Sequence, residues 1–278
     1  MSLITAFLLG VVQGFTEFLP VSSSGHLVLA QHLLGWKEPA IFFDVSLHLG
    51  TFIAVLAVFR KDLLDLIQGG IRLIFQQPFG RLSGNGGRLD DQERIFLLVV
   101  VGTLPIVAAG LLVRHWLQGL FASVPAVSIN LLITGTVLWL TRYIKHFTRK
   151  SPAMTRGKQA LYIGIAQAMA LAPGISRSGT TISAGLFLGL ERDWAGRYSF
   201  LLFVPAVMGA LILEGAHIKL ENIQLLQTLL GITTAAVSGY FALRVLLKVV
   251  RNGNFYVFAP YCWLIGVIGL VWTTIAGG

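Results

Sequence analysis

Six stretches of this chain are each long and apolar enough to cross a lipid bilayer, and they constrain the fold more than any other feature. A membrane span needs about 20 mostly apolar residues. Such stretches recur at 42–59, 95–113, 126–141, 198–213, 224–243 and 255–275. Only 12% of the residues are charged, roughly half the share in an average soluble domain. We therefore predict an all-α polytopic membrane protein with six transmembrane helices, surrounded by membrane lipids.

The basic residues lie in short runs between the apolar stretches. The formal net charge is +9, but this distribution is typical of cytoplasmic loops and argues against a nucleic-acid partner. The loops 60–94, 142–158 and 244–251 carry most of the positive charge. If these three loops are cytoplasmic, both termini are extracytoplasmic.

Two further segments place Pro, Gly, Ser and charged residues where a membrane helix would have apolar ones. They cover residues 13–26 and 167–181. Irregular backbone at membrane depth is tolerated only where protein or a water-filled cavity satisfies its amide groups. We therefore predict two re-entrant helical hairpins, at 3–34 and 159–190. Their expected helices are Leu3–Leu19 with Gly25–Leu34, and Gln159–Ala172 with Gly179–Leu190.

The two hairpins are related in sequence. A shift of 154 residues aligns Gln13 with Gln167, and it aligns the run at 22–25 (SSSG) with the run at 176–179 (SRSG). Three predicted spans follow each hairpin, an odd number, so the repeats must have inverted topology. We predict one membrane domain built from repeat 1 (1–150) and repeat 2 (151–278), with the hairpin tips meeting near the midplane.

The break in the second hairpin has the composition of an anion site. Arg177 lies in this break, just before the predicted helix Gly179–Leu190, and an ionisable residue at membrane depth is a functional hypothesis by default. Glycines and helix N-terminal amides suit phosphate, and a guanidinium offers it bidentate contacts. The candidate phosphate ligands share a hydroxyl group or an accessible backbone amide: Ser22, Ser24, Gly25, Gly174, Ser176, Ser178, Gly179, Thr180 and Thr181. Two such sites facing each other suit a diphosphate.

Gln13 and Glu17 are four residues apart and share one helical face. Their oxygens suggest a hard-cation site, because Mg²⁺ usually takes one or two carboxylates and completes its shell with phosphate and water. Structural interpretations remain open for several residues. An alternative interpretation of Glu17 and Arg177 is a structural ion pair between the repeats. The alternative for His26, Ser22 and Ser24 is that they cap helix ends. Asp44 and His48 are equally well explained as a pair within their helix or as neighbours of the site.

The two motifs, at 13–26 (QGFTEFLPVSSSGH) and at 173–181 (PGISRSGTT), give the chain a family resemblance. It resembles the undecaprenyl-diphosphate phosphatases of the bacitracin-resistance type over essentially its whole length. The resemblance implies hydrolysis of the C55 isoprenyl diphosphate to the monophosphate carrier used in peptidoglycan and cell-wall assembly. It also implies a bacterial plasma membrane and a divalent cation, Mg²⁺ or Ca²⁺.

The resemblance also implies roles for individual residues. Ser23 corresponds to the nucleophile, Glu17 and His26 to acid/base or metal-linked groups, and Arg177 to the phosphate clamp. The first acidic position of the family is Glu or Gln. Here it is Gln13, so this residue is expected to be a weak metal ligand beside Glu17. Attack by water, with Ser23 only binding phosphate, stays open.

A secondary transporter or lipid flippase with an anion site at the midplane is the alternative, since such proteins also use inverted repeats and broken helices. A transporter needs only the clamp, whereas this chain combines a nucleophile, a base and a clamp, which favours hydrolysis. A homo-oligomer, the isoprenoid length and the side of head-group entry stay open.

Overall fold

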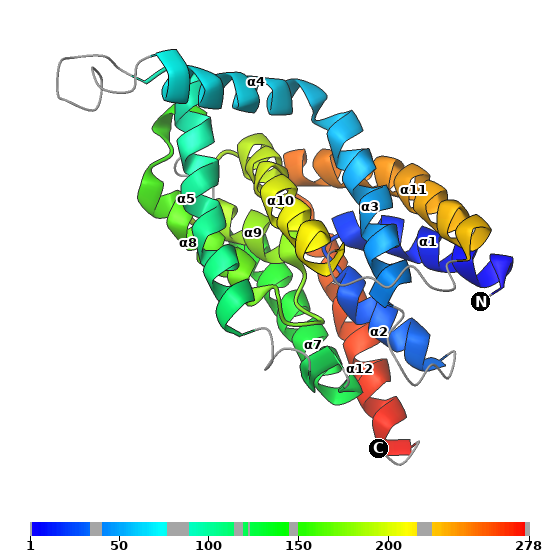
Figure 1. Ribbon diagram of the computed structural model, residues 1–278. Helices are drawn as coiled ribbons and strands as arrows, with labels where there is room; N and C mark the ends of the chain where they lie inside the picture. Colours follow the sequence, from blue (N-terminus) through cyan, green and yellow to red (C-terminus); the bar gives the residue numbers. More distant parts are fainter. Residues whose placement is uncertain are drawn as a thin grey trace.

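The computed structural model describes residues 2–33, 41–76, 89–113, 119–121, 123–144, 150–215 and 224–275. Within these ranges the chain forms helices joined by turns, apart from one isolated β-bridge between Lys150 and Leu190 (Figure 1). The all-α prediction is confirmed. Residue 34, the expected end of the first hairpin, and parts of the basic loops lie outside the described residues.

Five helices in the described residues are long and apolar enough to cross a membrane. They are α5 (Asp91–Leu112), α7 (Val124–Leu140), α10 (Arg192–Gly215), α11 (Leu225–Arg251) and α12 (Ala259–Ile275). Each overlaps a predicted span, although α10 begins six residues before the predicted start at 198 and α11 continues eight residues beyond the predicted end at 243. This extension ends in Lys248 and Arg251, which suit a helix C-terminus.

The remaining predicted span, 42–59, coincides with α3 (Ile41–Val58). The chain then bends by 83° into α4 (Arg60–Ile71), which runs across one end of the bundle and continues as a π-helix at Arg72–Gln76 (Figure 1). Taken together, α3 and α4 are long and apolar enough to count as a sixth span that is broken at the bend. Leu64, Ile67 and Phe75 are more than half exposed, so this bent segment has the apolar face of an interfacial helix.

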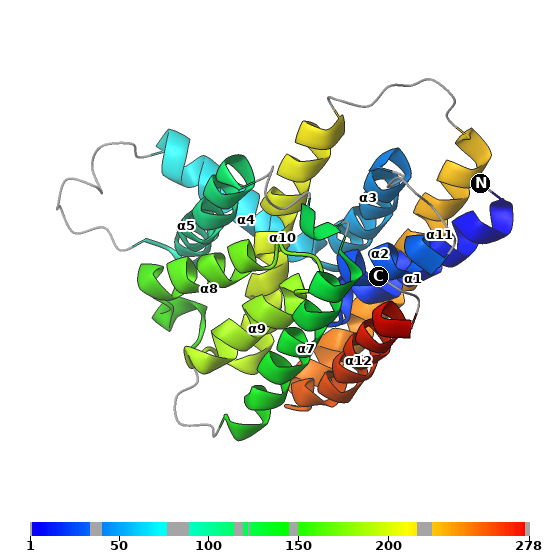
Figure 2. The ribbon, with the colours of Figure 1, turned by 90° about the horizontal axis from the view of Figure 1, so that it is seen from below.

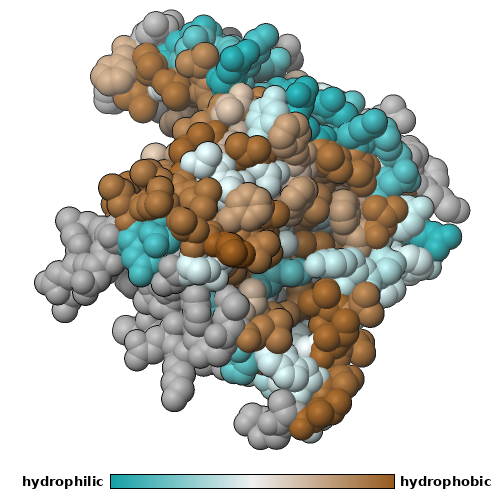
Figure 3. All heavy atoms as spheres, turned by 90° about the vertical axis from the view of Figure 1, so that its right-hand side faces the viewer, coloured by the Kyte–Doolittle hydropathy of each residue, from teal (hydrophilic) through white to brown (hydrophobic). Residues whose placement is uncertain are grey.

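The face of the molecule on which α1 and α11 lie is apolar in broad areas (Figure 3). On α11, for example, Leu225, Leu226 and Phe241 are all more than half exposed. Large contiguous apolar surface is rare on soluble proteins. It is what a bilayer requires of helices that face lipid.

Two short helix pairs occupy the positions of the predicted hairpins. The first is α1 (Leu3–Phe18) with α2 (Ser23–Leu33), and the second is α8 (Gly157–Met169) with α9 (Arg177–Phe187). The chain breaks at 19–22 and 170–176. The predicted breaks are therefore correct, and the helix ends lie within about three residues of those expected.

Each pair packs against spans from the other half of the chain. Helix α1 lies along α11, α8 lies along α5, and α7 packs against α12 (Figure 2). The first contact depends on a glycine, because a Cβ at Gly10 would overlap the carbonyl oxygen of Gly231 and the side chain of Thr234. Close backbone approach at small residues is a common way for membrane helices to associate.

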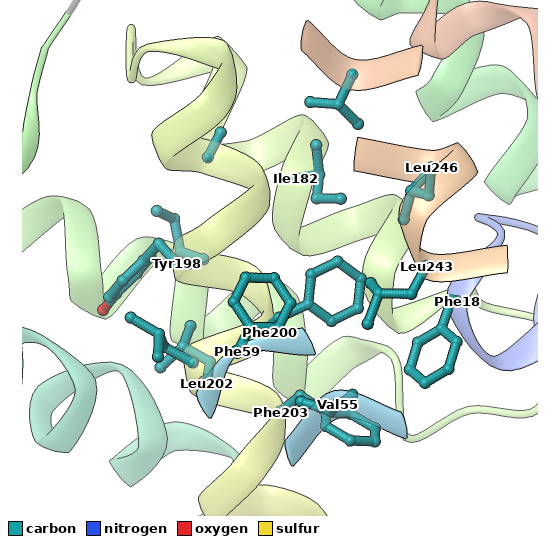
Figure 4. Packing of buried hydrophobic residues seen from close by; sticks show 14 of the residues in the cluster. Phe18, Val55, Phe59, Ile182, Tyr198, Phe200, Leu202, Phe203, Leu243 and Leu246 are labelled. Carbon is teal, nitrogen blue, oxygen red and sulfur yellow. The ribbon is translucent and has the colours of Figure 1, made fainter. Parts of the chain in front are cut away.

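The end of α1 is anchored in the largest core cluster. Phe18 is fully buried and packs edge-on against Phe200 and Phe203 of α10, with ring centroids 5.8 Å and 6.0 Å apart (Figure 4). Phe59, at the bend after α3, stacks on Phe200. Buried aromatic pairs of this kind stabilise beyond their area of burial, so the backbone that enters the first break has a fixed position.

Candidate active site

The two breaks meet at the carboxylate of Glu17, in the last turn of α1. The Glu17 side chain is only 5% exposed. Its Oε1 accepts a hydrogen bond from Arg177 Nη2 at 2.7 Å, and its Oε2 accepts one from Ser23 Oγ at 2.6 Å and one from Gln13 Nε2 at 3.0 Å. Hydrogen bonds to a charged acceptor are short and strong. A candidate nucleophile and a candidate phosphate clamp thus share one carboxylate.

Arg177 is the first residue of α9 and is held from two directions. Besides the contact with Glu17, its guanidinium carbon lies 3.8 Å from the centroid of the Phe203 ring. Such a cation–π contact is strongest when it is desolvated, and this side chain is 16% exposed. A guanidinium has five N–H donors, and one of them is directed to Glu17, which leaves donors for an anion.

Direct bonds join the two breaks to each other. The Gly174 amide donates to Ser22 Oγ at 3.1 Å, and Ser178 Oγ donates to the Phe18 carbonyl at 2.9 Å. Ser22 has a φ of 69°, a left-handed conformation that is uncommon for a residue with a side chain. Strain of this kind persists only where the surroundings enforce it, and it concentrates at functional sites.

Each break is also supported by a helix from the other half. On α7, Asn130 Nδ2 donates to the Pro173 carbonyl at 2.7 Å and Thr134 Oγ1 to the Gly174 carbonyl at 2.9 Å. On α12, Cys262 Sγ donates to the Pro20 carbonyl at 3.5 Å. Gly174 has a φ of +91°, and a Cβ there would overlap the Val127 carbonyl oxygen. The second break therefore requires glycine at this position.

His26 lies about one helical turn after Ser23, but its ring nitrogens bond other groups. Its Nδ1 donates to the Ser22 carbonyl at 2.8 Å, and its Nε2 is 2.9 Å from the Tyr261 hydroxyl, with the two rings stacked. Of the two base candidates, Glu17 is therefore the one hydrogen-bonded to the Ser23 hydroxyl. Tyr261, a neighbour of His26 on α12, was not identified from the sequence.

The other hydroxyl groups gather at the breaks as expected, but most of them bond backbone groups. Ser176 Oγ accepts from the Gly179 amide at 3.1 Å, Thr180 Oγ1 donates to the Ser176 carbonyl at 2.8 Å, and Thr181 Oγ1 donates to the Arg177 carbonyl at 2.7 Å.

In the first break, Ser22 Oγ accepts from the Gly25 amide and lies 3.3 Å from Ser24 Oγ. These residues shape the turns, and their part in binding phosphate stays a prediction. The amides in the first turns of α2 and α9 point toward the breaks, because the first N–H groups of a helix have no intrahelical acceptor.

His48 is the residue that the sequence placed least well. From α3, its Nε2 lies 3.6 Å from Glu17 Oε2, while its Nδ1 donates to the Asp44 carbonyl at 2.8 Å. The Asp44 carboxylate accepts from Gln31 Nε2 at 2.8 Å and 2.9 Å. Asp44 and His48 are thus joined through the backbone of the helix, and His48 also lies beside Glu17. The sequence signal that pointed to His48 was an ionisable side chain at membrane depth.

The residues around Glu17 are suitable for a divalent cation. The described residues contain no group of three or more His, Cys, Asp or Glu that could hold a metal. However, Gln13 is fully buried and its Oε1 has no hydrogen-bond partner. A carboxylate and an amide oxygen are hard donors, and two such groups leave most positions to water and phosphate, as Mg²⁺ prefers.

Comparison with known proteins shows the family to which this chain is similar. The family model described as bacitracin resistance protein BacA matches residues 6–268. The undecaprenyl-diphosphatase of Desulfosudis oleivorans is 48% identical over 268 residues, covering 96% of this chain and 97% of that protein. The undecaprenyl-diphosphatase of Desulforapulum autotrophicum is 45% identical over 278 residues, covering 98% of each chain. The protein of the same name from Methanobrevibacter smithii is 39% identical over 275 residues.

Proposed function

This chain belongs to the bacitracin resistance protein BacA family, and we infer that it catalyses the reaction after which its relatives are named. It is a multi-pass membrane hydrolase that converts undecaprenyl diphosphate to undecaprenyl phosphate and inorganic phosphate. The main structural support for this reaction is that Ser23 and Arg177, from different breaks, are hydrogen-bonded to the same Glu17 carboxylate. A transporter would need the arginine but not the paired serine, so the transporter alternative is not favoured.

In the proposed reaction, Ser23 is the nucleophile and Glu17 its base. A serine hydroxyl needs an adjacent base to react, and the 2.6 Å bond to Glu17 Oε2 provides one. As Ser23 Oγ bonds to the terminal phosphorus, its proton passes to Glu17 and the bond to the bridging oxygen breaks. Undecaprenyl phosphate leaves, and water then releases phosphate from the serine. In the alternative, water attacks directly and no phosphoserine forms, so acid-quench trapping of phosphoserine distinguishes the two.

Electrostatic stabilisation is the proposed role of the second break. Preorganised donors aimed at the transferring group usually provide the largest part of the acceleration. Arg177, fixed by Phe203 and Glu17, can turn its remaining donors to the phosphate, together with the N-terminal amides of α2 and α9. We assign His26 to proton transfer on the leaving-group side, with the Tyr261 hydroxyl as its neighbour.

A divalent cation, Mg²⁺ or Ca²⁺, is the proposed cofactor, with Glu17 and Gln13 as the residues that would hold it. Its chemistry when bound is to neutralise part of the negative charge of the diphosphate. The support from the structure is the unpaired Gln13 Oε1 beside the Glu17 carboxylate.

We further propose that the chain forms six crossings and two re-entrant hairpins in two inverted repeats, 1–150 and 151–278, with both termini extracytoplasmic. The packing supports this arrangement, because the relation between the halves is reciprocal. Helix α1 packs on α11 and α8 on α5. The first break is supported from α12 and the second from α7. A homo-oligomer stays a prediction.

The test is phosphate release from undecaprenyl diphosphate by the detergent-purified protein, with and without a metal chelator. We expect turnover with added divalent cation, a loss of turnover with chelator, and no turnover by a Ser23→Ala variant that is still inserted in membranes. A purified, folded protein that binds the lipid but releases no phosphate under any cation condition would contradict the assignment.

A further inference from the structure

We propose that α4 and the last turns of α11 form a docking surface for acidic phospholipids of the cytoplasmic leaflet. Helix α4 lies flat at the level of the lipid head groups, and exposed basic side chains of both helices bind the lipid phosphates. The inference goes beyond the proposed reaction and does not depend on it. Its test measures lipid contact rather than turnover.

The first observation is the direction of α4. The chain bends by 83° between α3 and α4, so a helix that follows a membrane crossing turns close to the plane of the membrane, across one end of the bundle (Figure 1). The bend is held from α10, because Arg197 Nε donates to Asp62 Oδ1, in the first turn of α4, at 2.9 Å. Helix α4 therefore has a fixed place at the end of the bundle, where head groups lie.

The second observation is that α4 has a packed side and a polar side. Leu63 is buried, and a Cβ at Gly70 would overlap the ring of Phe96 on α5. At about 100° per residue, Lys61 and Asp65 lie on the side of the helix opposite to Leu63. One side of α4 thus contacts the protein, and the opposite side suits water.

Between these two sides α4 carries an exposed apolar stripe. Its members recur every three or four residues and are about half exposed or more: Leu64, Ile67, Ile71 and Phe75. An interfacial helix buries such a stripe at the boundary between head groups and acyl chains. The protein covers one neighbouring side and water the other, so this lateral stripe suits lipid.

The third observation places the end of α11 beside the start of α4. Arg197 pairs with Asp62 of α4 and also with Asp193, whose Oδ2 lies 3.8 Å from Arg197 Nη1. The other oxygen of Asp193 accepts a hydrogen bond from Arg251 Nε, in the last turn of α11. This chain of ion pairs joins the three helices at the same end of the bundle.

The exposed side chains at this end are predominantly basic. They are Arg60 and Lys61 on α4, and Arg244 and Lys248 on α11. Among the residues that the structure describes, no ion pair involves Arg60, Lys61 or Lys248. The acidic side chains of α4 are already occupied, since Asp62 pairs with Arg197 and Asp65 accepts from Gln92 Nε2 at 2.8 Å.

Positive charge beside an exposed apolar stripe is complementary to an acidic phospholipid, which offers a phosphate and acyl chains together. Each lysine or arginine near an anionic membrane surface strengthens binding about fivefold. The basic loops predict that this end is cytoplasmic, which assigns the surface to the cytoplasmic leaflet.

The experiment measures lipid contact at Ile67 in the full-length protein. The variant Ile67→Cys, in a Cys262→Ala background, carries an NBD label, and the protein is reconstituted in phosphatidylcholine nanodiscs. A small, equal fraction of doxyl-labelled phosphatidylglycerol or phosphatidylcholine serves as the quencher. We expect both lipids to quench, with phosphatidylglycerol roughly threefold more effective, within the gain of about fivefold for one engaged basic residue. A label at Gln68→Cys, which lies about 100° further around the helix towards the polar side, should be quenched less by both lipids.

Matched double variants test the charge. Lys61→Gln with Lys248→Gln removes one basic residue from each helix, and the ratio of quenching by the two lipids should fall by about half or more. Arg156→Gln with Lys158→Gln removes two exposed basic residues at the start of α8 and should leave the ratio unchanged. Thermal unfolding in detergent should be the same in both double variants, which confirms that each retains its fold.

Three results would overturn the proposal. A label at position 67 that neither lipid quenches would place the stripe away from lipid and leave it to another macromolecule. Equal quenching by the two lipids would show contact without selection of acidic head groups. A ratio that both double variants lower equally, or that Lys61→Gln with Lys248→Gln leaves unchanged, would show that these side chains do not form the surface.

Discussion

Removal of Arg177 should have two separable effects, one on stability and one on catalysis. Arg177 Nη2 and Glu17 Oε1 are 2.7 Å apart, with side chains 16% and 5% exposed. At an effective dielectric constant of about 20, their attraction is roughly 6 kcal/mol, and the desolvation of two ions offsets most of it. The intact pair therefore contributes little net stability. Loss of the arginine alone leaves a buried carboxylate unpaired, which costs about 3–5 kcal/mol.

Two variants separate the two effects. Arg177→Gln should lower the free energy of unfolding by about 3–5 kcal/mol, and the double variant Glu17→Gln with Arg177→Gln should recover most of that loss. Both should lose phosphate release by at least 100-fold, the scale of a lost transition-state donor. Thermal unfolding and phosphate release in the same detergent provide the measurements. If the stable double variant kept its activity, the pair would be a structural tie between the repeats and the catalytic role of Arg177 would be wrong.

Three further predictions concern the surroundings of the site. Gly174→Ala should abolish activity and destabilise the fold by about 2 kcal/mol, because Gly174 has a left-handed backbone conformation and lies against α7. Gly209→Ala is the neutral control, because Gly209 lies in open space on α10. An equal loss of activity and stability in the two variants would refute the argument. Tyr261→Phe should lower kcat on the order of 10-fold at unchanged KM and alter the pH profile, since only the hydroxyl on His26 Nε2 is lost; an unaltered profile would exclude this role. Asp90→Ala removes the N-cap of α5 and should cost about 1 kcal/mol in thermal unfolding. A hydrogen bond from the backbone N–H of Glu93 lowers the pKa of Asp90. The stability that the Asp90 cap contributes is therefore fully present above the ordinary carboxyl pKa and is lost as the pH falls through the lowered pKa. An Asp90→Ala variant with the same acid sensitivity as the unmodified protein would contradict this.

The main helices and breaks could be predicted from the sequence because their signals are local. Apolar runs of membrane length and a Pro-Gly-Ser stretch within an apolar segment each report on their own backbone. The pairing of Glu17 with Arg177 followed from the cost of a charge at membrane depth. The α11 extension was missed, because its basic residues continue a helix that hydropathy alone ends earlier.

The fine assignment of side chains could not be predicted, because it depends on contacts between distant segments. Ser176 and Thr180 look the same in sequence whether their hydroxyls bind a ligand or a backbone group, and here they bond the backbone. Phe203 and His48 reach the site only through the packing of α10 and α3 against α1. The spacing of residues along the chain does not encode contacts between such distant segments.

The most direct test of a shared site is the distance between Ser23 and Arg177. Both bond the same carboxylate, so cysteines at these positions, in a Cys262→Ala background that removes the one native cysteine, should be joined by a short bifunctional thiol reagent in intact membranes. Efficient cross-linking within one chain is the predicted result. Cysteines that never cross-link, and that react with impermeant reagents from opposite faces of the membrane, would show that the two breaks do not form one site.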